Sequence, residues 1–325
     1  MTREAKLKAA ADLIQSAAQL LQRGEMREAA QQIEEAGQAW ESVPEDEDKK
    51  RLAVGAAIKE GKAQIAMQGS SLDDAQFYLE ESLVLHQREK AAGGSPNPLQ
   101  MAASCLNLST IAHKLGDNLK ALDLNTRAQD LLRNESAPPC RVFYATSFEA
   151  RATLLGLLGR LDEALAAFDA GAEAAARLVA EDVPGGKQLR TEMLVHSARG
   201  RARTGRPREA ALLVEEAAAL AWERFEASQG QDREAISHFV AAQMNLLGFA
   251  ETLGEFGRAE DALFKVLRLV GPDPRVLERG KKFYEALRLM DDAKLDAGNL
   301  PRDEVEESYQ QVLAIAQRAA QAPRA

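Results

Sequence analysis

Apolar residues recur along this chain with the spacing of an amphipathic helix, and no long stretch alternates apolar and polar positions as a half-buried strand would. Clusters rich in proline, glycine and charge interrupt the helical pattern at nearly constant intervals. These clusters are 44–50 (PEDEDKK), 93–98 (GGSPNP), 137–139 (APP), 182–186 (DVPGG), 228–232 (SQGQD) and 271–274 (GPDP). The segments between them are each about 40 residues long, which is typical of helical repeats.

A single glycine divides each segment into two predicted helices. The seven glycines are Gly24, Gly69, Gly116, Gly159, Gly205, Gly254 and Gly298. Each is expected to end a helix in the left-handed conformation, which costs glycine nothing. Ser71 with Asp74 has the pattern of a capping box, and Asp117, Asn97 and Asp273 are predicted N-caps.

The pattern therefore predicts an all-α protein, an α-solenoid of about seven helix-turn-helix repeats in one domain over residues 1–325. The expected repeats run roughly over 4–43, 50–92, 98–134, 141–181, 187–228, 232–270 and 275–321.

Small and large apolar residues hold fixed places around each glycine. Five residues after it stand Ala29, Ala121, Ala164, Ala210 and Ala259, and Ala75 follows Gly69 by six. Eleven residues before it stand Leu13, Ile58, Cys105, Phe148, Leu194 and Leu287, with Gln243 as the exception. Seven residues before it stand the small Ala17, Ser109, Ala152 and Ala198. A small residue lets two helices approach closely while a large one fills the adjacent space.

This arrangement resembles the tetratricopeptide repeat (TPR), most closely in Leu106–Leu132 and Leu154–Ala175. The period is longer than the usual TPR length and is similar to that of long-helix TPR arrays. The seventh repeat has Asp291 where a small residue belongs. The resemblance implies a right-handed superhelix in which the first helices of the repeats line a concave groove that binds another protein.

Motifs that signal catalysis or metal binding are missing from the sequence. The four histidines, His86, His113, His196 and His238, fall in different repeats without an HExxH pattern, and acids four residues away are expected to be surface partners. Cys105 and Cys140 form no CxxC motif, and no nucleophile elbow, Walker loop or dinucleotide fingerprint occurs. We expect no enzyme, no cofactor and no metal site.

Acidic residues outnumber basic ones by 50 to 41, which gives a net charge of −9 and disfavours a nucleic-acid-binding protein. No apolar stretch approaches the roughly 18 residues that a membrane helix needs, and residues 1–16 lack a cleavable signal. A cytoplasmic protein without membrane insertion is the expectation.

One stretch, 187–210, departs from the acidic background. It contains seven basic and two acidic residues, so its local charge is +5. The bases are Lys187, Arg190, Arg199, Arg201, Arg203, Arg206 and Arg208. Arg199 and Arg203 lie one turn apart on the first helix of the fifth repeat, the helix that faces the ligand in TPR proteins. Two interpretations stay open: a solvated helix end, or a patch that grips the carboxylates of an acidic peptide. Arg201 falls at a core-facing position, where it either extends to solvent or forms a polar groove floor.

Asn107 and Asn245 each stand nine residues before their glycine, and His196 occupies the same place in its repeat. The resemblance implies that such inward asparagines hydrogen-bond a bound peptide, although an asparagine satisfied within the core is an equal alternative. The predicted groove residues are Arg199, Arg203, His196, Asn245, Asn107 and Lys114.

The leading functional hypothesis is a non-enzymatic scaffold or adaptor that holds a partner peptide or helix in the groove. An acidic segment of that partner is the candidate for contact with the arginines. The alternative is a regulatory protein that senses a peptide or small ligand and changes its superhelical pitch on binding.

Overall fold

The structure, a computed structural model, describes residues 1–321, which form fifteen α-helices and no strand. The helices are α1 (Arg3–Gln22), α2 (Met26–Glu41), α3 (Lys49–Gln68), α4 (Leu72–Ala91), α5 (Pro98–Lys114), α6 (Asn118–Leu132), α7 (Pro138–Leu157), α8 (Leu161–Ala180), α9 (Gly186–Arg203), α10 (Pro207–Ala227), α11 (Arg233–Leu253), α12 (Phe256–Val270), α13 (Pro274–Arg288), α14 (Asp292–Ala297) and α15 (Arg302–Gln321). The predicted all-α repeat fold is confirmed.

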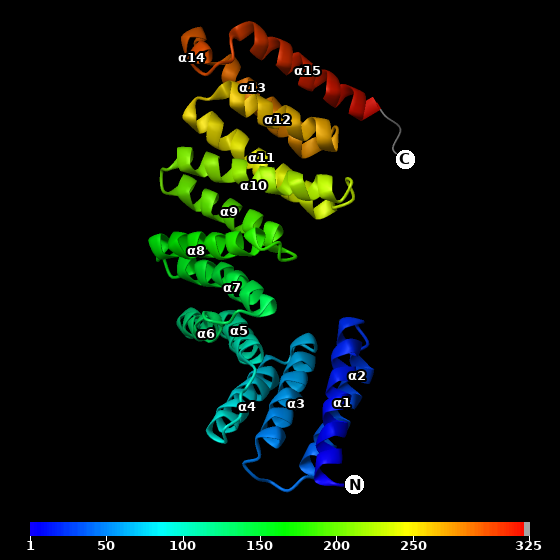
Figure 1. Ribbon diagram of the computed structural model, residues 1–325. Coiled ribbons are helices and arrows are strands. Elements are labelled where there is room, and N and C mark those ends of the chain that lie inside the picture. Colours follow the sequence, from blue (N-terminus) through cyan, green and yellow to red (C-terminus); the bar gives the residue numbers. More distant parts are fainter. Residues whose placement is uncertain (322–325) are drawn as a thin grey trace. The chain divides into compact units, whose positions relative to one another are not determined.

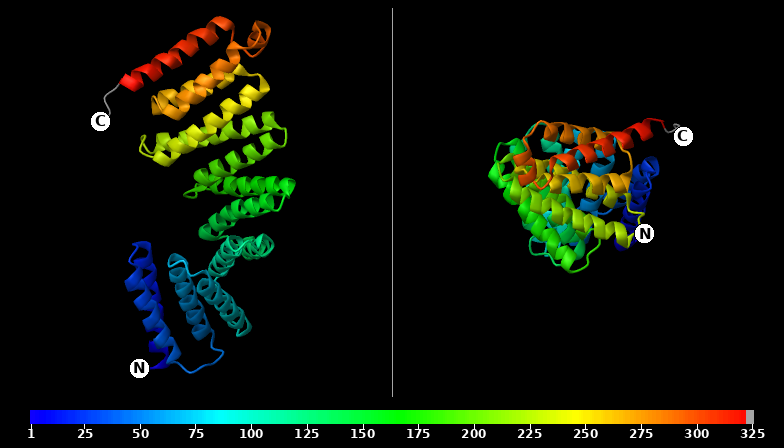
Figure 2. Two further views of the ribbon diagram at one scale, coloured as in Figure 1. Left: turned by 180° about the vertical axis from the view of Figure 1, so that it is seen from behind. Right: turned by 90° about the horizontal axis from the view of Figure 1, so that it is seen from above.

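The chain divides into two compact units. Unit 1, Met1–Arg160, contains α1 to α7, and unit 2, Leu161–Ala325, contains α8 to α15. Within each unit the helices stack as neighbours in chain order (Figures 1 and 2). The first helix of a repeat also contacts the first helix of the next, as α5 does with α7 and α9 with α11. The single domain and the repeat limits expected from the sequence stay a prediction.

The tight turns confirm five of the seven expected left-handed glycines and correct two. Gly69 (φ −75°) and Gly298 (φ −85°) are not left-handed, and the next residues, Ser70 (φ 63°) and Asn299 (φ 57°), take that place. Asparagine tolerates this conformation because its short polar side chain can bond locally. The shift at Ser70 explains the extra residue before Ala75, which stands five residues after the left-handed position like its counterparts.

Backbone hydrogen bonds close each of these turns. At the turn after α5, the N–H of Asp117 donates to the Ala112 carbonyl at 2.9 Å, the six-to-one bond of a Schellman motif. Asp117 then caps α6 by accepting from the N–H of Lys120. The capping box expected at Ser71 is wrong, because its hydroxyl donates to the Asp74 carboxylate (2.6 Å) and makes no hydrogen bond to the backbone.

The seventh repeat departs from the others. Its first helix, α13, ends at Arg288, and a second short helix, α14, begins at Asp292. Asp291 caps α14 by accepting from the N–H of Lys294 at 2.9 Å. A carboxylate in place of a small residue therefore starts a new helix here.

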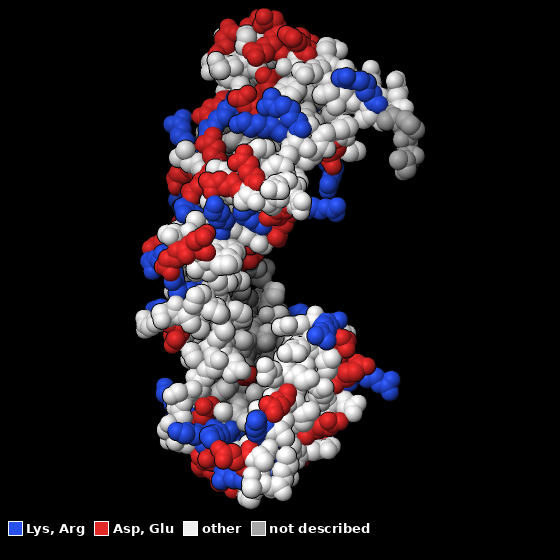
Figure 3. All heavy atoms as spheres, turned by 45° about the vertical axis from the view of Figure 1, so that its right-hand side comes forward, with Lys and Arg blue, Asp and Glu red and all other residues white. Residues whose placement is uncertain are grey.

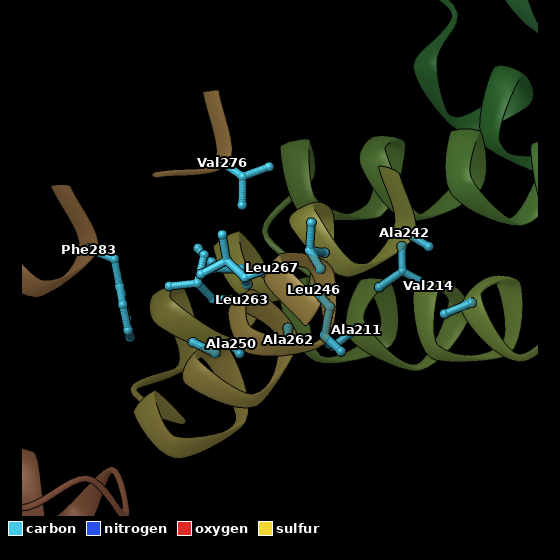
Figure 4. Close-up of a cluster of buried hydrophobic side chains, with 14 of the residues drawn as sticks. Ala211, Val214, Ala242, Leu246, Ala250, Ala262, Leu263, Leu267, Val276 and Phe283 are labelled. Atoms are coloured by element: carbon cyan, nitrogen blue, oxygen red, sulfur yellow. The ribbon is translucent and has the colours of Figure 1, made fainter. Parts of the chain in front are cut away.

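Alanines and large apolar residues build the core of unit 2 as the repeat pattern predicts. Ala210 and Ala259 are fully buried, and Ala164 is nearly so. Figure 4 shows Leu246 of α11 among side chains of α10 and α12, including Val214 and Leu263. Within residues 1–321, no helix combines the length and apolar character that crossing a membrane requires.

Candidate ligand-binding face

Most bases of the stretch are paired with carboxylates, either from other helices of unit 2 or from Glu209 at the end of the stretch itself. Four of its seven bases have carboxylate partners: Lys187 with Glu223, Arg190 with Glu216, Arg201 with Asp169, and Arg206 with Glu209. On the face that Figure 3 shows, side chains of the two signs of charge are interleaved over the unit. Arg199, Arg203 and Arg208 have no acidic partner among residues 1–321. Of the seven bases in the stretch, three arginines are therefore left without a carboxylate partner among residues 1–321.

Arg201 is held by ion pairs within unit 2. Its two terminal nitrogens each lie 2.8 Å from an oxygen of Asp169 on α8, and its Nε lies 3.2 Å from Glu209 on α10. Burial raises the pKa of Asp169, but the hydrogen bonds from Arg201 and Ser197 outweigh it and leave that pKa below its ordinary value. Arg201 thus connects three consecutive helices.

Arg199 on α9 contacts Asn245 on α11, so the first helices of two consecutive repeats meet at these side chains. The Nε of Arg199 donates to Oδ1 of Asn245 at 3.5 Å, a long bond, and Nδ2 of Asn245 donates to the Ala241 carbonyl at 2.7 Å. Arg203 stands one turn further along α9 and is exposed. We call Arg199, Arg203 and Asn245, together with Ser237 and Ala241 in line with Asn245 on α11, the first-helix face of unit 2.

A hollow of about 420 Å³ extends this face toward α13. Its walls are mainly apolar, and they include Val240 and Met244 of α11 and Val276 of α13. Asp273 and the exposed Arg275 lie at its α13 side. The face therefore offers apolar surface beside uncompensated cations, a combination suited to an amphipathic segment.

His196, another predicted groove residue, packs against the preceding repeat. Its ring stacks on Phe168 of α8 with centroids 5.3 Å apart and planes inclined by 8°. The residue is half-buried, so one face of the imidazole is covered by the protein itself.

The remaining two predicted residues, Asn107 and Lys114, belong to α5 in unit 1. Asn107 is half-buried, Lys114 is exposed, and neither side chain has a polar partner among residues 1–321. Beside them, α5 and α7 enclose a hollow of about 320 Å³ whose lining includes Thr110, Thr146 and Thr153. Four of the six predicted residues thus fall in unit 2, and two in unit 1.

The structure brings together one cluster that sequence reasoning missed. Glu192 of α9 and Glu234 and His238 of α11 place one ligand atom each within 4.8 Å of one another. Arg224 supplies positive charge there, because its guanidinium lies 3.3 Å from Nδ1 of His238 and 3.6 Å from Glu234. These residues suit a metal ion by type, but a bound cation would be repelled by Arg224. Glu192 pairs with His238 at 3.6 Å, across helices rather than along one.

A larger hollow, of about 620 Å³, lies between α10, α11 and α12. It contains Gln243, the one polar residue at a repeat position that is otherwise apolar or cysteine. In the sequence, this glutamine at an apolar repeat position was the one signal that pointed to the hollow.

A protein-family model matches most of unit 2. A family model described as a family of unknown function (DUF6483) matches residues 162–317. None of the curated proteins matches the sequence significantly.

Solved structures of similar fold include BtubC (BKLC) from P. vanneervenii, at 14% identity and a TM-score of 0.53, covering 83% of this chain and 91% of that one. The apo quorum sensor NprR from B. thuringiensis has 13% identity and a TM-score of 0.54, covering 96% of this chain and 82% of that one. A signal transduction ATPase with a tetratricopeptide repeat sensor from Pyrococcus horikoshii has 14% identity and a TM-score of 0.54. The match covers 94% of this chain and 43% of that one. Taken with the paired helices and Schellman turns, these likenesses show that the chain has a TPR-like α-solenoid fold.

Proposed function

We propose that the protein is a non-enzymatic interaction module whose first-helix face in unit 2 binds an acidic segment of a partner protein or peptide. The observation that carries the proposal is the selective pairing of the basic stretch. Four of its bases are held by carboxylates of the chain, while Arg199 and Arg203 on the first-helix face are left without one. An arginine without a carboxylate partner in its own chain is available to grip a carboxylate from outside.

The mixed character of the face supports a peptide over a simple anion. The apolar walls around Val240 and Met244 lie on the same helix as Asn245, whose amide already bonds to Arg199 and Ala241. A segment with alternating acidic and apolar side chains would satisfy both kinds of surface. The predicted residues Asn107 and Lys114 on α5 are proposed as a separate partner-contact surface of unit 1.

Two buried thiols support a non-enzymatic role. Burial raises the pKa of both Cys105 and Cys140, so neither is poised to act as a thiolate at neutral pH.

Peptide binding by charge-matched variants tests the proposal. A fluorescent peptide of glutamate and leucine residues is titrated against the wild-type chain, against Arg199→Ala with Arg203→Ala, and against Arg206→Ala with Arg208→Ala. Both double variants remove the same charge, so nonspecific attraction falls equally in both. We expect the first pair to weaken binding by about 2–5 kcal/mol if the carboxylates are desolvated, and by about 0–1 kcal/mol per arginine at a wet rim. Equal losses in the two variants, or none in either, would contradict the proposal.

A second candidate function is ligand sensing, and the similarity in fold to the apo quorum sensor NprR favours it. A sensor must change conformation on binding. Hydrogen exchange with and without the peptide distinguishes the two functions: protection confined to α9, α11 and α13 supports a scaffold, and altered exchange in helices remote from the peptide supports a sensor.

A further inference from the structure

A hollow between α10, α11 and α12 lies on the side of α11 opposite the first-helix face. Gln243 lines it, and Asn245 of the first-helix face is two residues further along the same helix. At 3.6 residues per turn these side chains leave the helix about 200° apart. The hollow, of about 620 Å³, has the size of a small-molecule site. Its lining includes Trp222, Phe239, Gln243, Leu246, Lys265 and Arg268.

One wall of the hollow is aromatic. Trp222 of α10 stays 37% exposed although it is the largest apolar side chain type, and its ring centroid lies 5.2 Å from that of Phe239 on α11. Leu246 lies about two turns further along α11 than Phe239, on the same side of the helix. An apolar body placed in the hollow would remove this surface from water.

Gln243 is a polar group without a partner inside this wall. It is 5% exposed, its Oε1 is buried without a hydrogen bond, and its amide makes no side-chain hydrogen bond to any of residues 1–321. In five other repeats the equivalent residues are buried Ile58, Cys105, Phe148, Leu194 and Leu287. A buried polar group without a partner destabilises the free protein, so an apolar residue would be better for folding alone.

The rim of the hollow is positively charged. Lys265 and Arg268 stand three residues apart on α12, both exposed and without an acidic partner among residues 1–321. Two like charges at this spacing repel each other. Glu215, the acid in the lining, is already paired with Arg258 at 2.7 Å. An anion at the rim would relieve the repulsion.

We propose that this hollow binds a small monocarboxylate with an apolar body. The body lies against Trp222, Phe239 and Leu246, and the carboxylate is attracted by Lys265 and Arg268 and accepts an N–H from Gln243. The site is independent of the first-helix face, so it stands or falls separately from the proposed function.

Trp222 provides the readout, because the chain has only two tryptophans and the other, Trp40, belongs to unit 1. Decanoate is titrated into the Trp40→Phe chain while emission is followed, with decanol as the uncharged control. We expect a saturable change with decanoate and weaker binding of decanol. If the Trp40→Phe chain folds poorly, decanoate is titrated into the wild-type chain and into Trp222→Phe. The difference between their emission changes then gives the signal of Trp222.

Charge and amide variants then test the assigned contacts. Lys265→Ala with Arg268→Ala should weaken decanoate binding about tenfold, whereas Arg208→Ala with Arg233→Ala, which removes the same charge outside the hollow, should leave it unchanged. Gln243→Leu should raise the melting temperature of the free protein and at the same time weaken binding, a combination that loss of structure cannot produce.

Three results would overturn the proposal: no saturable decanoate signal, equal affinities for decanoate and decanol, or equal effects of the two charge variants. If the hollow instead binds an acidic aromatic peptide and not free decanoate, the assignment to a small monocarboxylate is wrong.

Discussion

Arg201 and Asp169 form a two-pronged ion pair, with both guanidinium nitrogens 2.8 Å from separate carboxylate oxygens. The pair joins α9 to α8, and a third contact from Arg201 to Glu209 reaches α10. It is the clearest case in unit 2 of a charge that the protein uses for its own stability.

Replacing Arg201 by alanine should lower the free energy of unfolding by about 1–2 kcal/mol, because the bidentate geometry is favourable but Asp169 is half exposed. The effect should depend on pH. The pKa of Asp169 is lower in the folded state than its ordinary value near 3.9, so its stabilisation is present above that value and is lost as pH falls through the folded pKa. Urea unfolding of both proteins at pH 7 and near pH 3 measures this, and a stability difference that does not shrink at low pH would contradict it.

His86 should make unit 1 less stable as pH rises. Its Nε2 lies 3.0 Å from Glu60 and its Nδ1 3.4 Å from Glu89. Burial lowers the pKa of His86, but the hydrogen bonds and charges of the two glutamates outweigh burial and raise it overall.

The stabilisation by His86 is therefore complete below its ordinary pKa of about 6.5 and is lost as pH rises through the higher folded pKa. Thermal unfolding of wild-type protein should show this loss, and His86→Gln should flatten that part of the pH profile. An unchanged slope in the variant would show that another group is responsible.

Alanine substitutions at Gly298 and Gly69 should change the free energy of unfolding in opposite directions. A Cβ at Gly298 would lie 2.2 Å from Phe256 and 2.6 Å from the Gly254 carbonyl, so backbone must move and we expect a loss of at least about 1–3 kcal/mol. Gly69 has φ −75° and its nearest such contact is 3.4 Å, so Gly69→Ala should stabilise by about 0.4–1 kcal/mol. Chemical unfolding of the two variants gives both values, and a gain at Gly298 would show that the turn is packed differently.

Enlarging the buried alanine of the fifth repeat should overpack its helix crossing. Ala210 is fully buried, so Ala210→Leu is expected to cost about 1–3 kcal/mol, and Ala164→Leu should act in the same direction. The exposed Ala166 on α8 is the matched control, where leucine should change stability little. Equal melting temperatures for Ala210→Leu and Ala166→Leu would mean that the repeat register is wrong.

Local chemistry let the sequence alone predict the repeated helices and their turns. The helical spacing of apolar residues, the glycine at a helix end and an N-cap such as Asp117 act within a few residues, so they can be recognised without knowing the fold. Ala210 could be placed at a crossing because its distance from Gly205 is itself local. The left-handed residues Ser70 and Asn299 were missed because each follows a glycine, the residue type expected to take that conformation. Gly298 is a glycine for a different reason, since a Cβ there would clash with Phe256 and the Gly254 carbonyl.

Charge pairing and hollows were decided only by the tertiary structure. Arg201 was ambiguous in the sequence because its partner Asp169 is 32 residues away, on a different helix. The cluster around His238 and the hollow at Gln243 likewise depend on which helices meet. A helical pattern specifies which face is apolar, but side chains from three helices form a site only when the packing of those helices has set their distances.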